Sequence, residues 1–373
     1  MKYHRTLVPC LMVATAMLGP SRAFATTSHV IAAFDEAVRH SLPQTIHIST
    51  RQTLGRGAPA GSTLTITDTL DVDVRFPDGT GAQTYLATFD GAPAVVTRST
   101  DHLDVTVTGA DGIAITGYEM SSNAPHRIAE PHAGPARGLA PAAKRTSLAP
   151  ARAGAARAGN DYSLLSPNEA PPTLNLWIFL HDDTAAVSRR HIHAGYVAWW
   201  LADLKRFVPR HRFRVNYIDR REGMTDIVYG DRNAAITTWT KAAQGYEMRA
   251  NLPYAPGRYE HKFMLVTRDR VAPSTNGVAW HGGDQAMASL AGPWSIVAHE
   301  FGHTLTAVHD DSALWWSYVW PCATNLYPTH FGVTTNCYRY TQANEQLIAG
   351  YLSRKDDSPR PMASAGATLT MVE

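Results

Sequence analysis

Three histidines and a glutamate stand close together near residue 300. Residues 299–303 read HEFGH, and His309 follows shortly after. If this stretch is helical, His299 and His303 lie one turn apart on the same face, so both imidazoles can bind one ion. Neutral imidazole is a zinc ligand, and catalytic zinc sites combine three protein ligands with a position for water. The sequence therefore predicts one catalytic Zn²⁺ ion held by His299, His303 and His309.

Glu300 supplies a carboxylate beside the first predicted ligand. Zinc lowers the pKa of bound water to about 7 and polarises a carbonyl, while a nearby carboxylate can accept the proton and pass it to a leaving amine. We therefore expect Glu300 to act as general acid and base, not as a ligand. The predicted reaction is hydrolysis of peptide bonds.

The position of His309 constrains the helix. On an uninterrupted helix His309 would lie about 15 Å along the axis from His299, too far for both side chains to reach one ion. The helix must therefore end between His303 and His309.

These residues resemble the HExxHxxGxxH motif of the metzincin zinc metalloendopeptidases, in which a glycine ends the helix and the third histidine returns to the metal. His299, Glu300, His303 and His309 match the motif, and Asp310 matches the acidic residue that follows it in reprolysin-like members. The resemblance covers roughly residues 172–355. It implies an α/β (α+β) zincin-type domain with a mixed twisted sheet, a long backing helix and an active-site helix.

The sequence departs from this family at the helix end. Thr306 stands where the family has glycine. A β-branched residue held at positive φ costs about 1–3 kcal/mol, so either the turn is made differently or the strain is tolerated.

The sequence also departs from the family beneath the metal. The family has a methionine there, and no methionine occurs between His309 and Met362. Residues 322–328 are the equivalent segment, in which Leu326 or Tyr327 would fill the apolar floor. As in astacin-like members, Tyr327 is alternatively a candidate contact to the substrate or the oxyanion.

The start of the chain has the pattern of an export signal. Residues 1–25 combine a basic start, an apolar stretch and a small-x-small site that ends at Ala25. We expect cleavage after Ala25 and a secreted or periplasmic protein. Cys322 and Cys337 then form the remaining cysteine pair, and we predict that they form a disulfide, worth about 3 kcal/mol.

The composition divides the mature chain into regions. Residues 26–130 show a short helical pattern followed by period-two strands, which predicts a small, mostly β unit. Residues 131–160 are rich in Ala, Pro and Arg, as in a flexible linker open to proteases. Residues 26–160 are therefore predicted to be a propeptide, and a permanent N-terminal domain is the alternative. The protease domain is expected at 161–356, before a disordered tail at 357–373.

Periodicity predicts the elements of the protease domain, in which strand, helix and strand form a parallel crossover. In order, we expect strands at 174–180, 213–217 and 259–267, shorter strands at 276–280 and 285–289, and helices at 188–208 and 234–244. His191 and His193, two apart on the first helix, cannot chelate together and are expected to be solvated. The edge strand at 276–280 is expected to bind extended substrate by strand addition.

Two other interpretations remain open at this point. Asp310 or Glu345 could replace His309 as third ligand, as in other zincins. Alternatively, the chain could be a non-catalytic secreted binding module on a zincin fold. The net charge of +2 gives no reason to expect nucleic acid, and no apolar segment predicts a membrane span. The expected partner is a protein or peptide substrate, and the expected state is a monomer.

Overall fold

The structure is a computed structural model in which residues 27–49, 61–109, 112–122, 124–128, 171–252, 260–317, 320–328, 334–353 and 369–371 are described. The predicted signal peptide, the predicted linker at 131–160 and most of the predicted tail lie outside these residues. No helix in the described part of the chain is long and apolar enough to cross a membrane.

The N-terminal unit is mostly β, as predicted. Its elements are α1 (Thr27–Ala37), β1 (Gln44–Ser49), β2 (Gly61–Arg75), β3 (Gly81–Phe89), β4 (Ala92–Ser99), β5 (His102–Gly109), β6 (Gly112–Glu119) and β7 (His126–Ile128). Phe34 of α1 is fully buried and meets Tyr85 of β3 edge to face, with ring centroids 5.2 Å apart. The apolar side of α1 thus closes one face of this antiparallel sheet.

The C-terminal unit alternates strands with helices. Its first half contains β8 (Thr173–Leu180), the short η2 (Asp182–Thr184), α2 (Arg189–Ile192), η3 (His193–Val197), α3 (Ala198–Phe207), β9 (Arg212–Asp219), α4 (Arg232–Arg249) and β10 (His261–Thr267). Its second half contains β11 (Gly277–Trp280), β12 (Gln285–Ser289), α5 (Ile296–Thr304), η4 (His309–Asp311), β13 (Leu314–Ser317), β14 (Trp320–Ala323), β15 (Thr335–Asn336), α6 (Gln342–Leu352) and β16 (Leu369–Met371). These elements confirm the predicted order of strands and helices.

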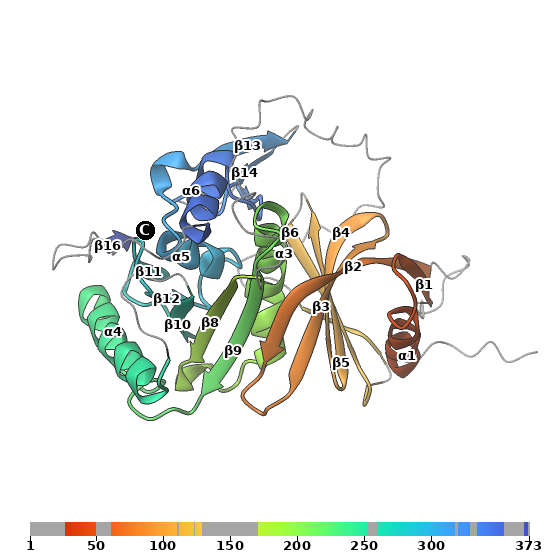
Figure 1. Cartoon of the computed structure of the whole chain (residues 1–373), viewed down its shortest axis with the longest axis horizontal. Coiled ribbons are helices and arrows are strands. Elements are labelled where there is room, and N and C mark those ends of the chain that lie inside the picture. The colour runs from red at the N-terminus through yellow and green to blue at the C-terminus, as the bar shows by residue number, and fades with distance from the viewer. Residues whose placement is uncertain are drawn as a thin grey trace, which may run out of the picture.

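The two units share one sheet of 13 described strands (Figure 1). Along it the order is β16-β11-β12-β10-β8-β9-β2-β3-β4-β5-β6-β7, and β1 pairs with β2. Strands β8, β9, β10 and β12 are parallel neighbours, and β11 runs antiparallel to β12. The predicted parallel pairing of β8 with β9 is confirmed.

Strand β2 joins the two units. Its first residues pair with β1, and residues 72–75 pair in parallel with β9. Register shifts after Ile66 and after Leu70 mark bulges, which bend a strand and increase its twist. The bent strand can therefore belong to both halves of the sheet.

Helices cover both faces of the C-terminal half of the sheet. On one face Ile178 of β8 packs in a core with Trp200 of α3 and Phe301 of α5. On the other face Phe179 packs against Trp239 of α4, with ring centroids 5.2 Å apart. Neighbouring β8 residues are thus buried on opposite faces, as expected for a strand covered on both sides.

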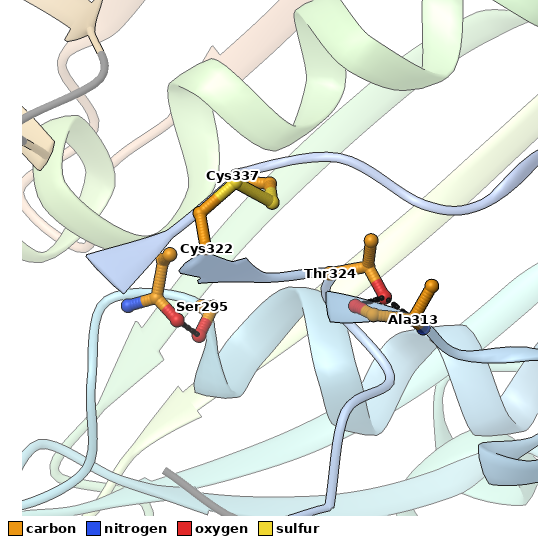
Figure 2. The surroundings of a disulfide bond; sticks show 6 residues. Ser295, Ala313, Cys322, Thr324 and Cys337 are labelled. Carbon is orange, nitrogen blue, oxygen red and sulfur yellow. Dashed lines mark hydrogen bonds between the residues drawn. A yellow bond between two sulfur atoms is a disulfide. The ribbon is translucent and has the colours of Figure 1, made fainter. Parts of the chain in front are cut away.

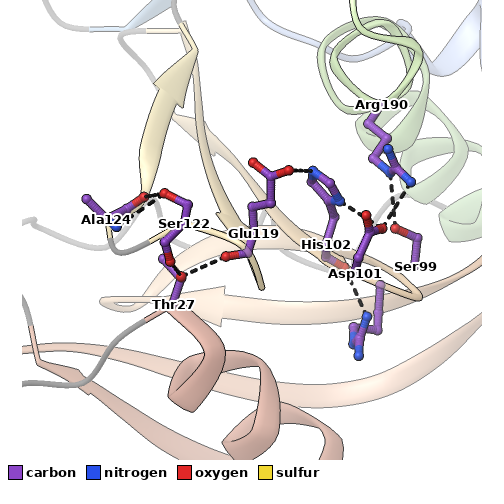
Figure 3. Close-up of polar contacts among 9 residues, drawn as sticks. Thr27, Ser99, Asp101, His102, Glu119, Ser122, Ala124 and Arg190 are labelled. Atoms are coloured by element: carbon purple, nitrogen blue, oxygen red, sulfur yellow. Dashed lines mark hydrogen bonds and ion pairs between the residues drawn. The ribbon is translucent and has the colours of Figure 1, made fainter.

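Side chains also join the two units (Figure 3). Arg190 of α2 donates to Asp101 and Ser99 of the N-terminal unit, at 3.0 and 3.2 Å. The buried Thr106 hydroxyl donates to the carbonyl of Ala194 at 3.1 Å. The N-terminal unit therefore contacts the long helix directly as well as through the sheet.

Two predictions are corrected by the structure. The predicted helix at 188–208 contains a π-helical turn, η3, which begins at His193. His193 is completely buried, not solvated, and its Nδ1 lies 2.9 Å from the Tyr217 hydroxyl. In the tail, predicted to be disordered, Leu369–Met371 form a strand against β11.

Candidate metal centre

The helix α5 carries the first two histidines and is buried along its whole length. Ile296, Val297 and Phe301 supply its apolar side chains, and every residue of the helix is buried, so the helix lies inside the core. Phe301 stacks on Trp200 of α3, with centroids 5.2 Å apart and planes at 4°. The backing helix thus fixes the rotation of α5 and the direction of its histidines.

The helix ends at Thr304, between His303 and His309 as the position of His309 requires, and the chain turns at Thr306. Thr306 has a φ of 74°, so this β-branched residue adopts the left-handed conformation that the family gives to glycine. The Ala307 N–H donates to the Gly302 carbonyl at 2.9 Å, and the Thr306 N–H donates to the His303 carbonyl at 3.0 Å. These are the two bonds of a Schellman motif. The turn is therefore the usual helix ending, and the strain at Thr306 is tolerated.

The loop after β11 holds this turn in place. The Gly282 N–H donates to the His303 carbonyl at 2.8 Å, and the His281 Nε2 lies 3.1 Å from the Thr306 carbonyl. The Thr306 hydroxyl donates to the Leu347 carbonyl of α6 at 3.3 Å. Contacts from two elements thus fix a backbone conformation that threonine alone disfavours.

Asn344 fixes the segment that leads to His309. This α6 residue is fully buried, and its side chain forms two hydrogen bonds with the backbone of Val308. The Val308 N–H donates to Asn344 Oδ1 at 2.8 Å, and Asn344 Nδ2 donates to the Val308 carbonyl at 3.0 Å. His309 follows directly, so Asn344 sets where its imidazole lies.

The three histidines converge on one point. Their Nε2 atoms lie 2.9 Å apart between His299 and His309, and 3.0 Å from His303 to each of the others. An ion bound at about 2.0–2.1 Å fits this triangle, because each nitrogen lies well within two bond lengths of the others. Among the described residues, these three histidines form the group whose possible metal-ligand atoms lie within 4.8 Å of one another.

The protonation state of the histidines suits a metal. His303 Nδ1 lies 2.9 Å from the Ala307 carbonyl, which can only accept, so the proton is on Nδ1 and the Nε2 lone pair faces the other rings. Burial and the neighbouring His309 lower the pKa of His303 to about 3. Burial also lowers the pKa of His309. Neutral imidazole at neutral pH is the form that binds a metal ion.

Glu300 is completely buried, and neither carboxylate oxygen has a hydrogen-bond partner among the described residues. Burial raises the pKa of Glu300 well above its usual value. A cation nearby would favour the ionised carboxylate again. A buried carboxyl group without a polar partner, one residue from His299, therefore fits a site built around a metal ion.

Gly277 makes room for this carboxylate. A Cβ at position 277 would stand 2.4 Å from Glu300 Oε1 and 2.7 Å from Cδ. The Glu300 side chain therefore lies directly against the backbone at the start of β11.

The floor beneath α5 is made by Leu326 and Tyr340. A Cβ on Gly302 would lie 3.0 Å from atoms of each, so the glycine inside HEFGH allows this close packing. Leu326 is completely buried, whereas Tyr327 is half-buried. Of the two residues predicted to replace the family's methionine, Leu326 occupies the floor.

The predicted disulfide is present and stabilises this region (Figure 2). Cys322 of β14 is bonded to Cys337, with Cα atoms 5.0 Å apart. Nearby, the Thr324 hydroxyl bonds with the backbone of Ala313 at 3.0 Å. The segment after His309 is thereby tied to the floor.

The alternative third ligands lie elsewhere. Glu345 forms an ion pair with Arg206 of α3 and does not join the histidine cluster. Asp310 also lies outside the cluster, and its charge opposes the lowering of the His309 pKa. The Tyr327 N–H donates to the Thr324 carbonyl at 2.9 Å, and its contact to substrate or oxyanion stays a prediction.

Sequence reasoning missed Gly277 and Asn344. Gly277 lies in the strand predicted at 276–280, and an isolated glycine in a strand does not identify the group that approaches it. Asn344 follows Thr341, the helix cap of α6, and nothing nearby in sequence links it to Val308. Both roles depend on contacts between segments distant in the chain.

The histidine helix packs on one face of the mixed sheet, and β11 runs antiparallel to β12 near one end of that sheet. The structure is similar to the crystal structure of metalloproteinase-II from Bacteroides fragilis, with a TM-score of 0.58 over 90% of this chain and 97% of that chain. The two sequences are 13% identical, so the similarity concerns the fold. No protein-family model matches the sequence, and the comparison with curated proteins finds no relative.

Proposed function

We propose that this protein is a secreted zinc-dependent endopeptidase of the metzincin type, close to the reprolysin-like members. The convergence of three Nε2 atoms within 3.0 Å of one another, beside the buried carboxyl group of Glu300, carries this proposal. His299, His303 and His309 would hold the ion. When bound, zinc acidifies a water molecule and polarises the carbonyl of the scissile bond.

The protein's own residues would transfer the proton. Glu300, held against Gly277, accepts a proton from the attacking water and later donates it to the leaving amine. The apolar packing around α5 excludes bulk water from this carboxylate. The His303 Nδ1–H bond to the Ala307 carbonyl keeps the Nε2 lone pair available.

The substrate is proposed to bind as an extended strand. Strand β11 lies near the end of the catalytic half of the sheet, runs antiparallel to β12 and begins at the residue that contacts Glu300. A peptide paired with β11 would gain main-chain hydrogen bonds and would pass close to that carboxylate. This arrangement favours endopeptidase activity on unfolded or flexible segments.

Hydrolysis of casein and of a fluorogenic peptide tests the proposed function. We expect cleavage by the secreted protein, loss of cleavage after zinc chelation, and recovery when zinc is added back. A protein that binds one zinc ion yet cleaves no substrate after its linker is cut would instead support the non-catalytic binding module.

We further propose that residues 1–25 direct export and that residues 26–160 are a propeptide. For the N-terminal unit to leave after the linker is cut, the parallel pairing of β2 with β9 and the contacts of Arg190 must break. N-terminal sequencing of the active secreted form tests removal, and an N-terminus at Thr26 would contradict it.

A further inference from the structure

The outer edge of β11 is already paired in this structure. Strand β16 runs antiparallel along it, with Leu369 opposite Trp280, Thr370 opposite Ala279 and Met371 opposite Val278. Figure 1 shows β16 beside β11, at the end of the sheet away from the N-terminal unit. Since β12 pairs with the other edge, β11 has partners on both sides.

The direction of β16 leads toward the candidate catalytic carboxylate. From Leu369 to Met371 the segment passes from Trp280 to Val278. The next residue of β11 is Gly277, whose backbone contacts Glu300. The segment thus follows the path that the proposed function gives to an extended substrate.

The sequence of this segment suits strand pairing. Residues 367–372 read ATLTMV, with no proline and no charge, after the polar stretch SRKDDSPRP at 353–361. Alternating threonine and apolar residues are typical of a strand. Nothing in the segment protects it from pairing with an open edge.

From this pairing we propose that the outer edge of β11 is a strand-binding surface whose resident occupant is Leu369–Met371 of the same chain. Each backbone N–H and C=O group of that edge can pair with one neighbouring strand, so β16 and an extended peptide exclude each other. A tethered segment acts at an effective concentration near millimolar. If its own Kd for the edge is about 0.1 mM, the need to displace it weakens peptide binding about tenfold. The inference about substrate access rests on the proposed function, whereas the occupancy of β11 does not.

Peptide binding without hydrolysis tests the occupancy. The full chain carrying Glu300→Gln is compared with the same variant ended at residue 368, using a fluorescein-labelled peptide of sequence ATLTMVE and fluorescence anisotropy. We expect the shortened variant to bind the peptide at least about tenfold more tightly. Amide hydrogen exchange in β11 should also be faster in the shortened variant without peptide, and should slow when the peptide is added.

Two further variants separate backbone pairing from side-chain effects. Thr370→Ala keeps the backbone groups and should behave like the unshortened chain. Thr370→Pro/Met371→Pro should behave like the shortened chain, because one of two successive residues in an antiparallel strand bonds to a given neighbour. Equal peptide affinity and equal exchange in the full and shortened chains would overturn the proposal. Exchange protection that disappears on dilution would also overturn it, since the occupant would then come from a second copy.

The peptide-binding experiment tests the occupancy of β11 independently of catalytic activity. An inactive wild-type protein with an occupied β11 would contradict the proposed function alone. An active protein whose KM for a peptide is the same with and without residues 369–373 would contradict the competition between β16 and the substrate.

Discussion

The carboxyl group of Glu300 lies against the backbone of Gly277, so that a side chain at position 277 would stand 2.4 Å from Oε1. This contact joins the candidate general base to the edge strand that would bind substrate. The base and the peptide backbone are therefore positioned by the same short segment of the chain.

A methyl group at position 277 should disturb the base and leave the metal in place. In Gly277→Ala the new Cβ would displace the Glu300 carboxylate, and a misplacement of about 1 Å costs about 10²-fold in rate. We expect kcat to fall by about that factor, with zinc content unchanged because the histidines are untouched. Gly350→Ala is the matched control, since no atom lies within 4 Å of its added Cβ. An unchanged kcat in Gly277→Ala would contradict the position of Glu300.

Metal affinity should depend on Asn344. In Asn344→Ala both bonds to Val308 are lost, so the segment before His309 is no longer fixed. Loss of a residue that orients a ligand typically weakens metal binding 10–100-fold, and we expect a zinc Kd higher by about that factor in chelator competition. Asn344→Asp keeps the Oδ1 acceptor and should give an intermediate Kd. The exposed Gln346→Ala on the same helix serves as control. Equal zinc affinity in all of these variants would mean that Val308 is fixed by other contacts.

Glycine at position 306 should stabilise the fold. Thr306→Gly removes the strain of a β-branched residue at a φ of 74°, although it loses the long hydroxyl bond to Leu347. The net gain in unfolding free energy should be about 1 kcal/mol. Urea denaturation of the two proteins at equal zinc concentration measures it. A lower unfolding free energy in Thr306→Gly would show that the hydroxyl contact outweighs the strain.

Acid should destabilise the protein through His193. Burial lowers the pKa of His193 to about 3, from 6.5 in the unfolded chain. Between these values the unfolded state binds more protons, so the unfolding free energy falls as the pH falls. One pKa unit corresponds to about 1.4 kcal/mol, which gives a loss of about 2 kcal/mol at pH 5 relative to neutral pH.

The variant His193→Gln cannot titrate and separates this contribution from that of other groups. Its unfolding free energy, measured by urea denaturation, should change less between pH 7 and pH 5 than that of the wild type. Identical pH profiles for the two proteins would exclude His193 as the source of the acid sensitivity.

Much of the C-terminal unit could be predicted from sequence because its patterns are local. The apolar run at 174–180 predicts β8, and the helical spacing that continues to Phe207 predicts the helical segment of α2, η3 and α3 without its π-helical turn. The break between His303 and His309 followed from the length of a helix alone. The sequence could not decide whether the turn at Thr306 is made differently or its strain is tolerated, because the contacts from Gly282 and Leu347 belong to distant segments. The structure shows that the strain is tolerated.

Features that depend on long-range packing were not predictable. The sequence gives no sign that β2 pairs with β9 across the two units. The burial of His193 depends on Tyr217 and on the π-helical turn, not on helical spacing. The strand Leu369–Met371 lies in the tail predicted to be disordered, and its pairing depends on the distant edge of β11.

Peptide hydrolysis by the Glu300→Gln variant tests the central claim most directly. The variant keeps the three histidines and should bind one zinc ion with wild-type affinity. General acid and base catalysis typically contributes a factor of about 10²–10⁴, so kcat/KM for a fluorogenic peptide should fall at least about 10²-fold. Zinc bound equally by both proteins, with hydrolysis only by the wild type, is the predicted result. Equal hydrolysis by both proteins would contradict the assignment of Glu300, and no hydrolysis by the zinc-loaded, processed wild type would contradict the proposed function.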